Sequence, residues 1–312
     1  MTTGINISKK LEAGLRATGR KIGNTRLIPV RGLHRNEYVR IYAKAEWEQL
    51  SGSIKARAAF YIIRHAVLQG MLDEHITLLD ATSGNTGIAY AAIGRELGIP
   101  VALCLPENAT KERKETLEAL GAQIIYTSKF GGTDEAQEVA ADLALRYPGK
   151  YFYASQYTNE QNWKAHYYGT AEEIIRAAPD ASHFVAGLGT TGTFTGTARR
   201  LKEINPLIQA ISLQPDLPLH GLEGWKHLET AIVPKIYDAS VADRDIAIPT
   251  SAAYEVLEKV YRAEGLLLSP SSAANIAGAI QVADSIDTGT VVTVLPDNAD
   301  RYSEVVRQII PS

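Results

Sequence analysis

The sequence predicts an α/β protein built on parallel sheets. From residue 77 onward, short apolar runs such as TLLDA at 77–81 and PVALCL at 100–105 alternate with longer segments of helical periodicity. The apolar runs have the length of strands, and the segments between them have the length of helices. Strands that alternate with helices in this way form parallel sheets, because each helix carries the chain back to the edge where the next strand begins.

The individual elements follow this alternation in order. The expected strands are TLLDA (77–81), PVALCL (100–105), QIIYT (123–127), YFY (151–153), HFVAGL (183–188), AISL (210–213) and VVTVL (291–295). The expected helices are the apolar-rich segment after Lys55, TGIAYAAIGREL (86–97), ERKETLEAL (112–120), DEAQEVAADLALRY (134–147), a long stretch near 161–177 and TGTARRLKEI (195–204). Residues 214–249 are the least regular, and a loop-rich stretch of this length in a compact protein is often functional.

Composition excludes several classes of function. The 312 residues are 45% hydrophobic and 21% charged, with a net charge of −3, so no electrostatic argument favours nucleic acid or an anionic membrane as the main partner. No apolar run approaches the roughly 20 residues that cross a bilayer, and the first 20 residues lack the apolar core of a signal peptide. The single cysteine, Cys104, lies in a strand-like run and is expected to be a buried thiol. The seven histidines show no metal-ligand spacing, so no metal is expected. Because the sequence shows neither a membrane-spanning run nor a signal-peptide pattern, the cytoplasm is the expected location.

The segment SGSIK at 51–55 places Lys55 where a turn-prone patch meets an apolar helix. A lysine there is either a reactive amine or a side chain that reaches past the helix to water. The segment alone supports both explanations.

ATSGNTG at 81–87 lies between an expected strand and an expected helix. Its small residues allow a ligand to approach the backbone, and the N–H groups at the start of a helix attract a phosphate or a carboxylate. Ser83, Asn85 and Thr86 add short polar side chains. A capped turn between strand and helix explains the same residues, so both interpretations stay open.

GLGTTGTFTGT at 187–197 contains a G-x-G-x-x-G pattern at Gly187, Gly189 and Gly192. The pattern alone is a weak indication of dinucleotide binding, because the acidic residue expected after the next strand is poorly matched. Thr190, Thr191 and Thr193 favour a cup for a single phosphate, lined by backbone N–H groups and hydroxyls.

Two further polar segments lie near the C-terminus. In LLLSPSSAANIAGA (266–279), Ser269 or Ser271 either caps the following helix or points into a pocket. In LPDNADRY (295–302), Asp297 begins a polar loop at the carboxyl end of a strand, where sites in α/β proteins open, although a solvated turn explains it equally well.

Taken in order, these segments resemble the fold type II pyridoxal-phosphate enzymes, and within them the cysteine synthase group that includes the catalytic cores of cystathionine β-synthase. The resemblance covers nearly the whole chain, from IGNTRL (22–27) through SQYTNEQNWKAHYYGTAEEI (155–174) to the serines near 270. It implies two parallel-sheet α/β domains with the cofactor between them. We expect a smaller mobile domain at 45–155 and a larger cofactor-binding domain of 1–44 plus 156–312.

The resemblance also implies roles for individual residues. Lys55 would be the catalytic residue that holds the aldehyde of pyridoxal 5′-phosphate and takes the α-proton of the substrate. The phosphate would be bound by Gly189, Thr190, Thr191, Gly192 and Thr193, the ring hydroxyl by Asn85, and the pyridine nitrogen would face Ser271. The carboxylate of the amino-acid substrate would be bound by Thr82, Ser83, Gly84, Thr86 and Gln156.

The activity implied is β-replacement through an aminoacrylate intermediate, which makes L-cysteine from O-acetylserine or O-phosphoserine and sulfide in a homodimer. Departures from the family pattern include Arg26 for proline, Glu48-Gln49-Leu50 where Asn-Pro is usual near the lysine, and Ala56 for aspartate. Because some of them border the pocket, the leaving group stays open, as do cystathionine synthesis, serine or threonine deamination and an inactive regulatory protein of the same fold. In the irregular stretch 214–249, Lys226 is a candidate for recognising a phosphate leaving group.

Overall fold

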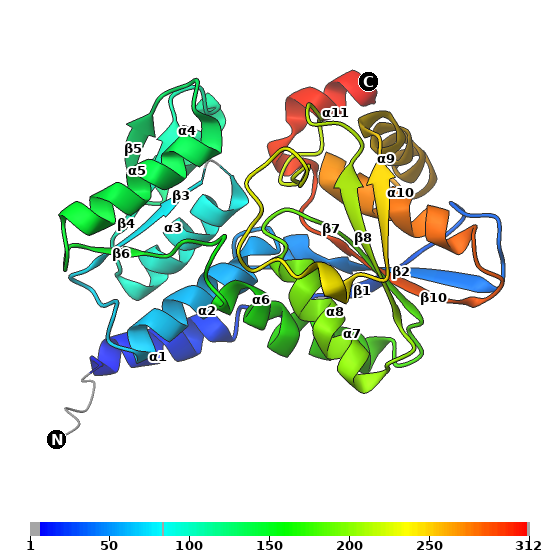
Figure 1. The fold of residues 1–312 in the computed structure, drawn as a ribbon, viewed down its shortest axis with the longest axis horizontal. Helices are drawn as coiled ribbons and strands as arrows, with labels where there is room; N and C mark the ends of the chain where they lie inside the picture. The colour runs from blue at the N-terminus through cyan, green and yellow to red at the C-terminus, as the bar shows by residue number, and fades with distance from the viewer. Residues whose placement is uncertain (1–6, 83, 311–312) are drawn as a thin grey trace. The chain divides into compact units, whose positions relative to one another are not determined.

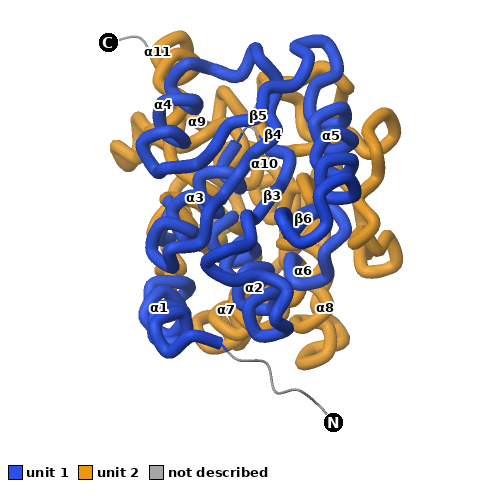
Figure 2. The backbone as a smooth tube through the Cα atoms, turned by 90° about the vertical axis from the view of Figure 1, so that its left-hand side faces the viewer, with its two compact units in different colours: residues 1–23, 49–51, 55–162 blue, residues 24–48, 52–54, 163–312 orange. Residues whose placement is uncertain are grey.

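Two open sheets, each covered by helices, organise the chain in the computed structural model, which describes residues 7–82 and 84–310 (Figure 1). Backbone contacts divide the chain into two compact units (Figure 2). Unit 1 contains residues 1–23, 49–51 and 55–162, and unit 2 contains residues 24–48, 52–54 and 163–312. The mobility expected for residues 45–155 is a separate question and stays a prediction.

Unit 1 is built on a four-stranded sheet in the order β5-β4-β3-β6, in which every pair of neighbours is parallel. The strands are β3 (Thr77–Ala81), β4 (Val101–Pro106), β5 (Gln123–Thr127) and β6 (Tyr151–Tyr153). The central strands β3 and β4 are buried along most or all of their length, as their continuous apolar sequences require. Asp80 is the exception in this apolar setting, paired in register with Leu103.

Helices enclose the sheet of unit 1. They are α1 (Lys9–Gly19), α2 (Lys55–Leu68), α3 (Asn85–Leu97), α4 (Lys111–Ala119) and α5 (Gly132–Arg146). Helix α5 packs on β3, β4 and β6, and its buried alanines form a small core with Leu79 and Cys104. Helices α1, α2 and α3 share the larger core with Leu78, Leu103 and Leu105 of the sheet. The two cores leave the carboxyl ends of β3 and β4 free to carry loops.

Unit 2 is built on a six-stranded sheet in the order β1-β2-β10-β7-β8-β9. Its strands are β1 (Leu27–Val30), β2 (Val39–Ala45), β7 (His183–Gly187), β8 (Gln209–Pro215), β9 (Arg244–Ile248) and β10 (Gly289–Leu295). The pairs from β2 to β9 are parallel, whereas β1 is antiparallel to β2. The expected parallel α/β architecture is therefore confirmed from β2 to β9, and the edge strand β1 adds an antiparallel pair, because a short connection from β1 to β2 cannot return the chain for a parallel pairing.

Helices lie on both faces of the unit 2 sheet. They are α6 (Gln161–Ala165), which begins in unit 1, α7 (Ala171–Ala177), α8 (Gly192–Ile204), α9 (Thr250–Glu264), α10 (Pro270–Ala283) and α11 (Ser303–Ile309). Helices α7 and α8 share a core with Phe184 on one face, and α9 and α10 share a core with Val185 on the other. Helix α10 is rich in alanine and almost wholly buried, so it passes through the interior of its unit.

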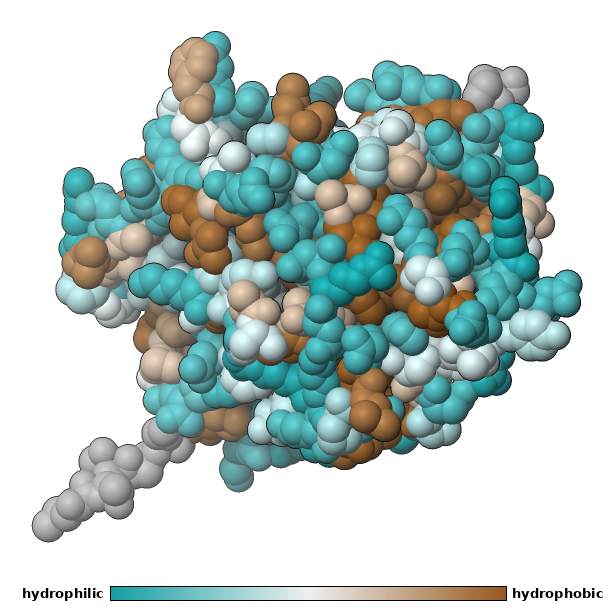
Figure 3. Space-filling model, turned by 45° about the vertical axis from the view of Figure 1, so that its right-hand side comes forward, coloured by the Kyte–Doolittle hydropathy of each residue, from teal (hydrophilic) through white to brown (hydrophobic). Residues whose placement is uncertain are grey.

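A π-helical turn, His166–Thr170, interrupts the helical run between α6 and α7. The seven expected strands and the expected helices are confirmed, although β9 lies inside the stretch that the sequence predicts to be irregular. No helix in the part of the chain that the structure describes is long and apolar enough to cross a membrane. Hydrophilic and hydrophobic side chains are interspersed over the face shown in Figure 3.

Candidate active site

Lys55 is the first residue of α2 and is half-buried, while the next five residues of the helix, 56–60, are buried. The turn that leads into it depends on Gly52, whose φ of +71° is a left-handed conformation that favours glycine. The N–H of Ile54 donates to the carbonyl of Pro296 at 2.8 Å, which holds the backbone of the residue directly before Lys55. The local structure thus presents the amine of Lys55 at the start of a helix whose remaining length is anchored in a core.

The loop before α3 contains most of the residues expected to bind a carboxylate. Thr82 is buried, its N–H donates to the carbonyl of Cys104 at 3.1 Å, and its Oγ1 accepts from the N–H of Gly84 at 3.2 Å. Asn85 begins the helix, and Gly84 caps it without a side-chain hydrogen bond. Within the described residues, the N-cap position therefore supplies no side chain to the N–H groups of the first turn, an arrangement that suits an anion. Ser83 lies outside the described residues.

Gln156 is brought to this loop from the segment after β6. Its Oε1 accepts from the hydroxyl of Thr86 at 2.7 Å, and both side chains are buried. The preceding Ser155 has a φ of +45°, and the side chain of Asn162 donates to the carbonyl of Gln156 at 2.7 Å, so a tight turn fixes the backbone here. The structure thus joins two residues that the sequence separates by 70 positions.

Asp80, which sequence reasoning missed, contacts the same glutamine. Its Oδ2 accepts from the N–H of Gln156 at 3.2 Å, and its Oδ1 accepts from the N–H of Ala81 at 2.8 Å. Burial raises the pKa of the carboxyl to about 7, and these hydrogen bonds oppose the rise only in part. The signal that could have revealed it is an acidic residue inside the otherwise apolar run TLLDA.

The start of α8 is the loop expected to bind phosphate. Its N-cap, Thr191, has a φ of +71°, which is an outlier for a β-branched residue, and makes no side-chain cap hydrogen bond. The hydroxyl of Thr191 is buried and has no hydrogen-bond partner within residues 7–82 and 84–310. No acidic residue lies in the first turn of this 13-residue helix. A strained backbone that buries an unused donor at a helix N-terminus is the arrangement expected of a fixed anion site.

The first two glycines of the G-x-G-x-x-G pattern have a packing role. A Cβ on Gly187 would lie 2.0 Å from the indole of Trp225, and a Cβ on Gly189 would lie 2.1 Å from the carbonyl oxygen of Gly224. The N–H of Lys226 also donates to the carbonyl of Leu188 at 2.8 Å. The glycines therefore admit the loop around residue 225 against the end of β7, which accounts for the pattern without a dinucleotide.

His166 is a second residue that the sequence did not single out. It is buried in the π-helical turn, with Nδ1 2.9 Å from the hydroxyl of Thr170 and Nε2 3.3 Å from the hydroxyl of Thr193. The extra residue of a π-helical turn is often found at functional sites. Here the imidazole contacts a threonine in the first turn of α8.

Ser269 and Ser271 occupy different positions at the start of α10. Ser269 caps α10, because its Oγ accepts from the N–H of Ser272 at 3.2 Å. Ser271 follows in the first turn, buried, with its Oγ 3.2 Å from that of Ser269. Asp297 is buried rather than solvated, and its Oδ2 accepts from the hydroxyl of Tyr302 at 2.8 Å. Ser269 is therefore the cap, and the hydroxyl of Ser271 contacts that of Ser269.

These side chains fit pyridoxal phosphate. Unit 1 offers the amine of Lys55, which would suit the aldehyde of the cofactor, and unit 2 offers hydroxyl and N–H donors at the start of α8 and the neutral hydroxyl of Ser271, which would suit a phosphate and a pyridine nitrogen. The buried hydroxyl of Thr191, which has no partner in the described part of the chain, is the observation that supports the fit most directly.

Comparison with known protein families, relatives and solved structures shows which family the chain belongs to. The chain belongs to the pyridoxal-phosphate dependent enzyme family, whose match extends over residues 19–297. It is 42% identical to a cysteine synthase of Aquifex aeolicus over 90% of this chain and 88% of that protein. It is 34% identical to an O-acetylserine dependent cystathionine β-synthase of Bacillus subtilis, over 90% of this chain and 94% of that protein. The crystal structure of an O-ureido-L-serine synthase superposes with a TM-score of 0.87 at 27% identity, covering 93% of this chain and 94% of that one. The fold is therefore that of the fold type II enzymes.

Proposed function

We propose that the protein makes L-cysteine from an activated serine and sulfide. The observation that carries the proposal is the 42% identity to a cysteine synthase along 90% of the chain, together with a lysine at the start of α2. In the reaction the bond from Cβ to the ester oxygen breaks, acetate or phosphate leaves, and sulfide forms the new bond to Cβ.

Bound pyridoxal phosphate would supply an electron sink for the α-carbon of the substrate. Lys55 would hold the cofactor and then, once the substrate amine takes its place, accept the α-proton at Nζ. The loop from Gly189 to Thr193 would bind the phosphate, Asn85 the ring hydroxyl, and Ser271 would place a neutral hydroxyl at the pyridine nitrogen. Thr82, Ser83, Gly84, Thr86 and Gln156 would hold the carboxylate of the substrate and orient its α-carbon toward Lys55.

The decisive experiment compares the purified holoprotein with Lys55→Ala. Wild type should be yellow, should change its visible spectrum when O-acetylserine is added, and should release cysteine when sulfide follows. Lys55→Ala should lose the colour and the turnover. Lys259→Ala removes an exposed lysine of α9 and should change neither. A Lys55→Ala protein with full activity and an unchanged spectrum would show that the assignment is wrong.

Cystathionine synthesis is a second candidate, because the chain is also 34% identical to the Bacillus subtilis enzyme named above. The two activities share the first half-reaction and differ in the thiol that adds. Offering sulfide and homocysteine to the same holoprotein, with O-acetylserine as donor, therefore decides between them. We expect sulfide to be used at the higher kcat/KM.

The leaving group is open to a direct test through Lys226. Its backbone is tied to Leu188, one residue before the proposed phosphate loop, and its side chain is half-buried. A cation beside the substrate would favour O-phosphoserine, since hydrogen bonds to charged groups contribute roughly 1.5–3 kcal/mol. Lys226→Ala should then lower kcat/KM for O-phosphoserine about tenfold or more and leave that for O-acetylserine unchanged. Equal effects on both substrates would remove Lys226 from leaving-group recognition.

We also propose that the protein is a cytoplasmic homodimer and that residues 45–155 move as a smaller domain when substrate binds. Light scattering on the purified holoprotein measures the mass directly. Hydrogen exchange with and without O-acetylserine tests the motion, since the loops of a closing domain should gain protection.

A further inference from the structure

Asp80 is a buried acid that the proposed chemistry does not use. It is 1% exposed and stands in β3 between Leu79 and Ala81, both fully buried. No lysine, arginine or histidine forms an ion pair with it in the described residues. Burying an acid without a counter-charge is unfavourable, so its retention in the middle of an apolar strand needs a reason.

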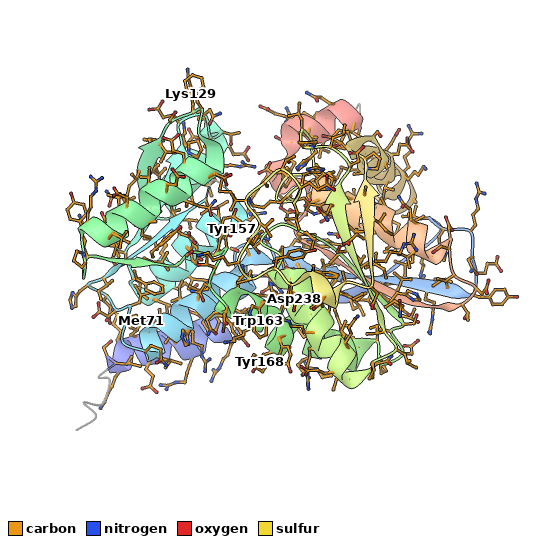
Figure 4. The ribbon with its side chains drawn as sticks, in the orientation of Figure 1. Met71, Lys129, Tyr157, Trp163, Tyr168 and Asp238 are labelled. Atoms are coloured by element: carbon orange, nitrogen blue, oxygen red, sulfur yellow. The ribbon has the colours of Figure 1, made fainter. Side chains whose placement is uncertain are left out.

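The groups that face Asp80 are all weak acids. They are Tyr90 of α3, Cys104 of β4, Tyr153 of β6 and Tyr157, which follows β6 and is labelled in Figure 4. Burial raises the pKa of each of them, so none ionises near neutral pH. The hydroxyl of Tyr90 lies near the carboxyl but does not reach hydrogen-bond geometry. The hydrogen bonds of Asp80 are therefore directed at the backbone.

Those hydrogen bonds form a closed clamp on Gln156. Asp80 accepts from the N–H of Gln156, and the side-chain Nε2 of Gln156 donates back to the carbonyl of Ala81 at 3.3 Å. The backbone and the side chain of the glutamine are thus both held against the end of β3. Its remaining polar atom, Oε1, accepts from Thr86 at 2.7 Å. One acid therefore fixes a residue whose side chain meets the start of α3.

We propose that Asp80 is a positioning residue, which holds Gln156 against Ala81 so that the Thr86–Gln156 pair is preset to receive the carboxylate of the amino-acid substrate. The inference deepens the proposed function and rests on it. Asp80 acts through Gln156 and does not touch the substrate. Small displacements of a pair that orients a substrate weaken binding even when no contact to the substrate is removed.

The first test is Asp80→Asn, which keeps the size of the side chain. One of the two carboxylate oxygens becomes an NH₂ group, so an N–H then faces the backbone N–H of either Ala81 or Gln156. We expect KM for the amino-acid substrate to rise about tenfold, kcat to stay within twofold, and the visible spectrum and the cofactor affinity to stay unchanged. Tyr90→Phe is the matched control, because it removes a hydroxyl beside Asp80 without touching Gln156, and it should leave KM within twofold. A fall in kcat with an unchanged KM would overturn the assignment.

The second test separates positioning from a general loss of structure. In a Gln156→Ala protein the group being positioned is already absent, so adding Asp80→Asn should raise KM no more than twofold further. A tenfold rise in both backgrounds would show that Asp80 acts independently of the glutamine. If Asp80→Asn does not fold, the smaller Asp80→Ser replaces it in both backgrounds with the same expectations.

A third measurement does not depend on turnover. Hydrogen exchange at the backbone N–H of Gln156 should become at least tenfold faster in Asp80→Asn than in wild type, while exchange in α10 stays the same. If wild type makes no cysteine, the proposed function falls, and this measurement alone decides whether Asp80 holds Gln156. An unchanged exchange rate at Gln156 would overturn the clamp even in an active enzyme.

Discussion

The starts of α3 and α8 are built from similar residues and differ in how their hydroxyls are used. Both follow a parallel strand and contain small residues and threonines. Before α3, Thr82 and Thr86 already form hydrogen bonds with Gly84 and Gln156. At α8, the hydroxyl of Thr191 is buried without a partner among the described residues. Unused donors suit a ligand that stays, whereas donors already bonded within the protein suit one that arrives and leaves with every turnover.

The largest difference should come from adding one methyl group to each loop. Gly189→Ala places a Cβ 2.1 Å from the carbonyl oxygen of Gly224, a backbone atom that cannot turn away. A Cβ added to Gly84 would meet no heavy atom beyond its chain neighbours within 4 Å among the described residues, and the φ of Gly84 is not positive. We expect Gly189→Ala to lower the free energy of unfolding of the cofactor-free protein by about 3 kcal/mol. Gly84→Ala should change it by less than about 0.5 kcal/mol. Urea denaturation of both variants measures the contrast, and equal losses would contradict it.

Thr191→Gly should have effects of opposite sign on stability and on binding. Glycine relieves the left-handed backbone and removes a buried unpartnered hydroxyl, so the cofactor-free protein should gain about 1 kcal/mol. The lost hydrogen bond to the phosphate should weaken cofactor binding by roughly 1.5–3 kcal/mol. Melting of the cofactor-free protein and titration with pyridoxal phosphate give the two numbers. Lower stability with unchanged cofactor affinity would mean that the hydroxyl serves the fold.

Thr86→Ala tests whether the start of α3 binds the amino-acid substrate, which enters and leaves with every turnover. Removing its hydroxyl should raise KM for the amino-acid substrate about tenfold and leave cofactor affinity unchanged, since the α8 loop is intact. Thr116→Ala, which removes an exposed hydroxyl on α4 that bonds the carbonyl of Glu112, is the control. Titration with substrate and with cofactor distinguishes the two sites, and a loss of cofactor affinity alone would reverse the assignment.

A further effect concerns pH and arises beside the α3 loop. The pKa of Asp80 is about 7 in the folded protein against 3.8 ordinarily, so between about pH 4 and 7 the folded state holds a proton that the unfolded state has lost. This group therefore lowers stability as pH rises through that window, by at most about 1.4 kcal/mol per pH unit, with no further change above it. Subtracting the urea stability of Asp80→Asn from that of wild type at each pH isolates this contribution. A difference that stays constant between about pH 5 and 7 would show that the carboxyl is already ionised in the folded protein.

The sequence predicts where the loops before α3 and α8 lie, but not which contacts their residues make. Strand–loop–helix order located both of them, because periodicity and small residues are local properties. It could not show that Gly187 and Gly189 make room for Trp225 and Gly224, since those contacts join segments more than 30 residues apart. The roles of Asp80 and His166 were missed for the same reason, because each depends on partners that only the fold brings near.

The edge of the larger sheet was the least predictable part of the fold. The sequence TRLIPV gives no sign of whether its partner is parallel or antiparallel, and β9 was hidden in a stretch rich in turns and prolines. In both cases the pairing is decided by the neighbouring strand rather than by the residues themselves.

The place of β2 beside β10 has a consequence for how the chain is made. Every residue of unit 1 has been synthesised once position 162 is reached, whereas β2, which until then can pair only with β1, waits for a second partner that ends at Leu295. On the ribosome, unit 1 can therefore close its sheet while most of unit 2 is still untranslated, and Val39–Ala45 must stay unaggregated for some 250 further residues. Arresting synthesis after residue 200 and exposing the nascent chain to protease should find β3 to β6 protected and β2 cut. Protection of β2 at that point would show that another part of the chain shields it in the meantime.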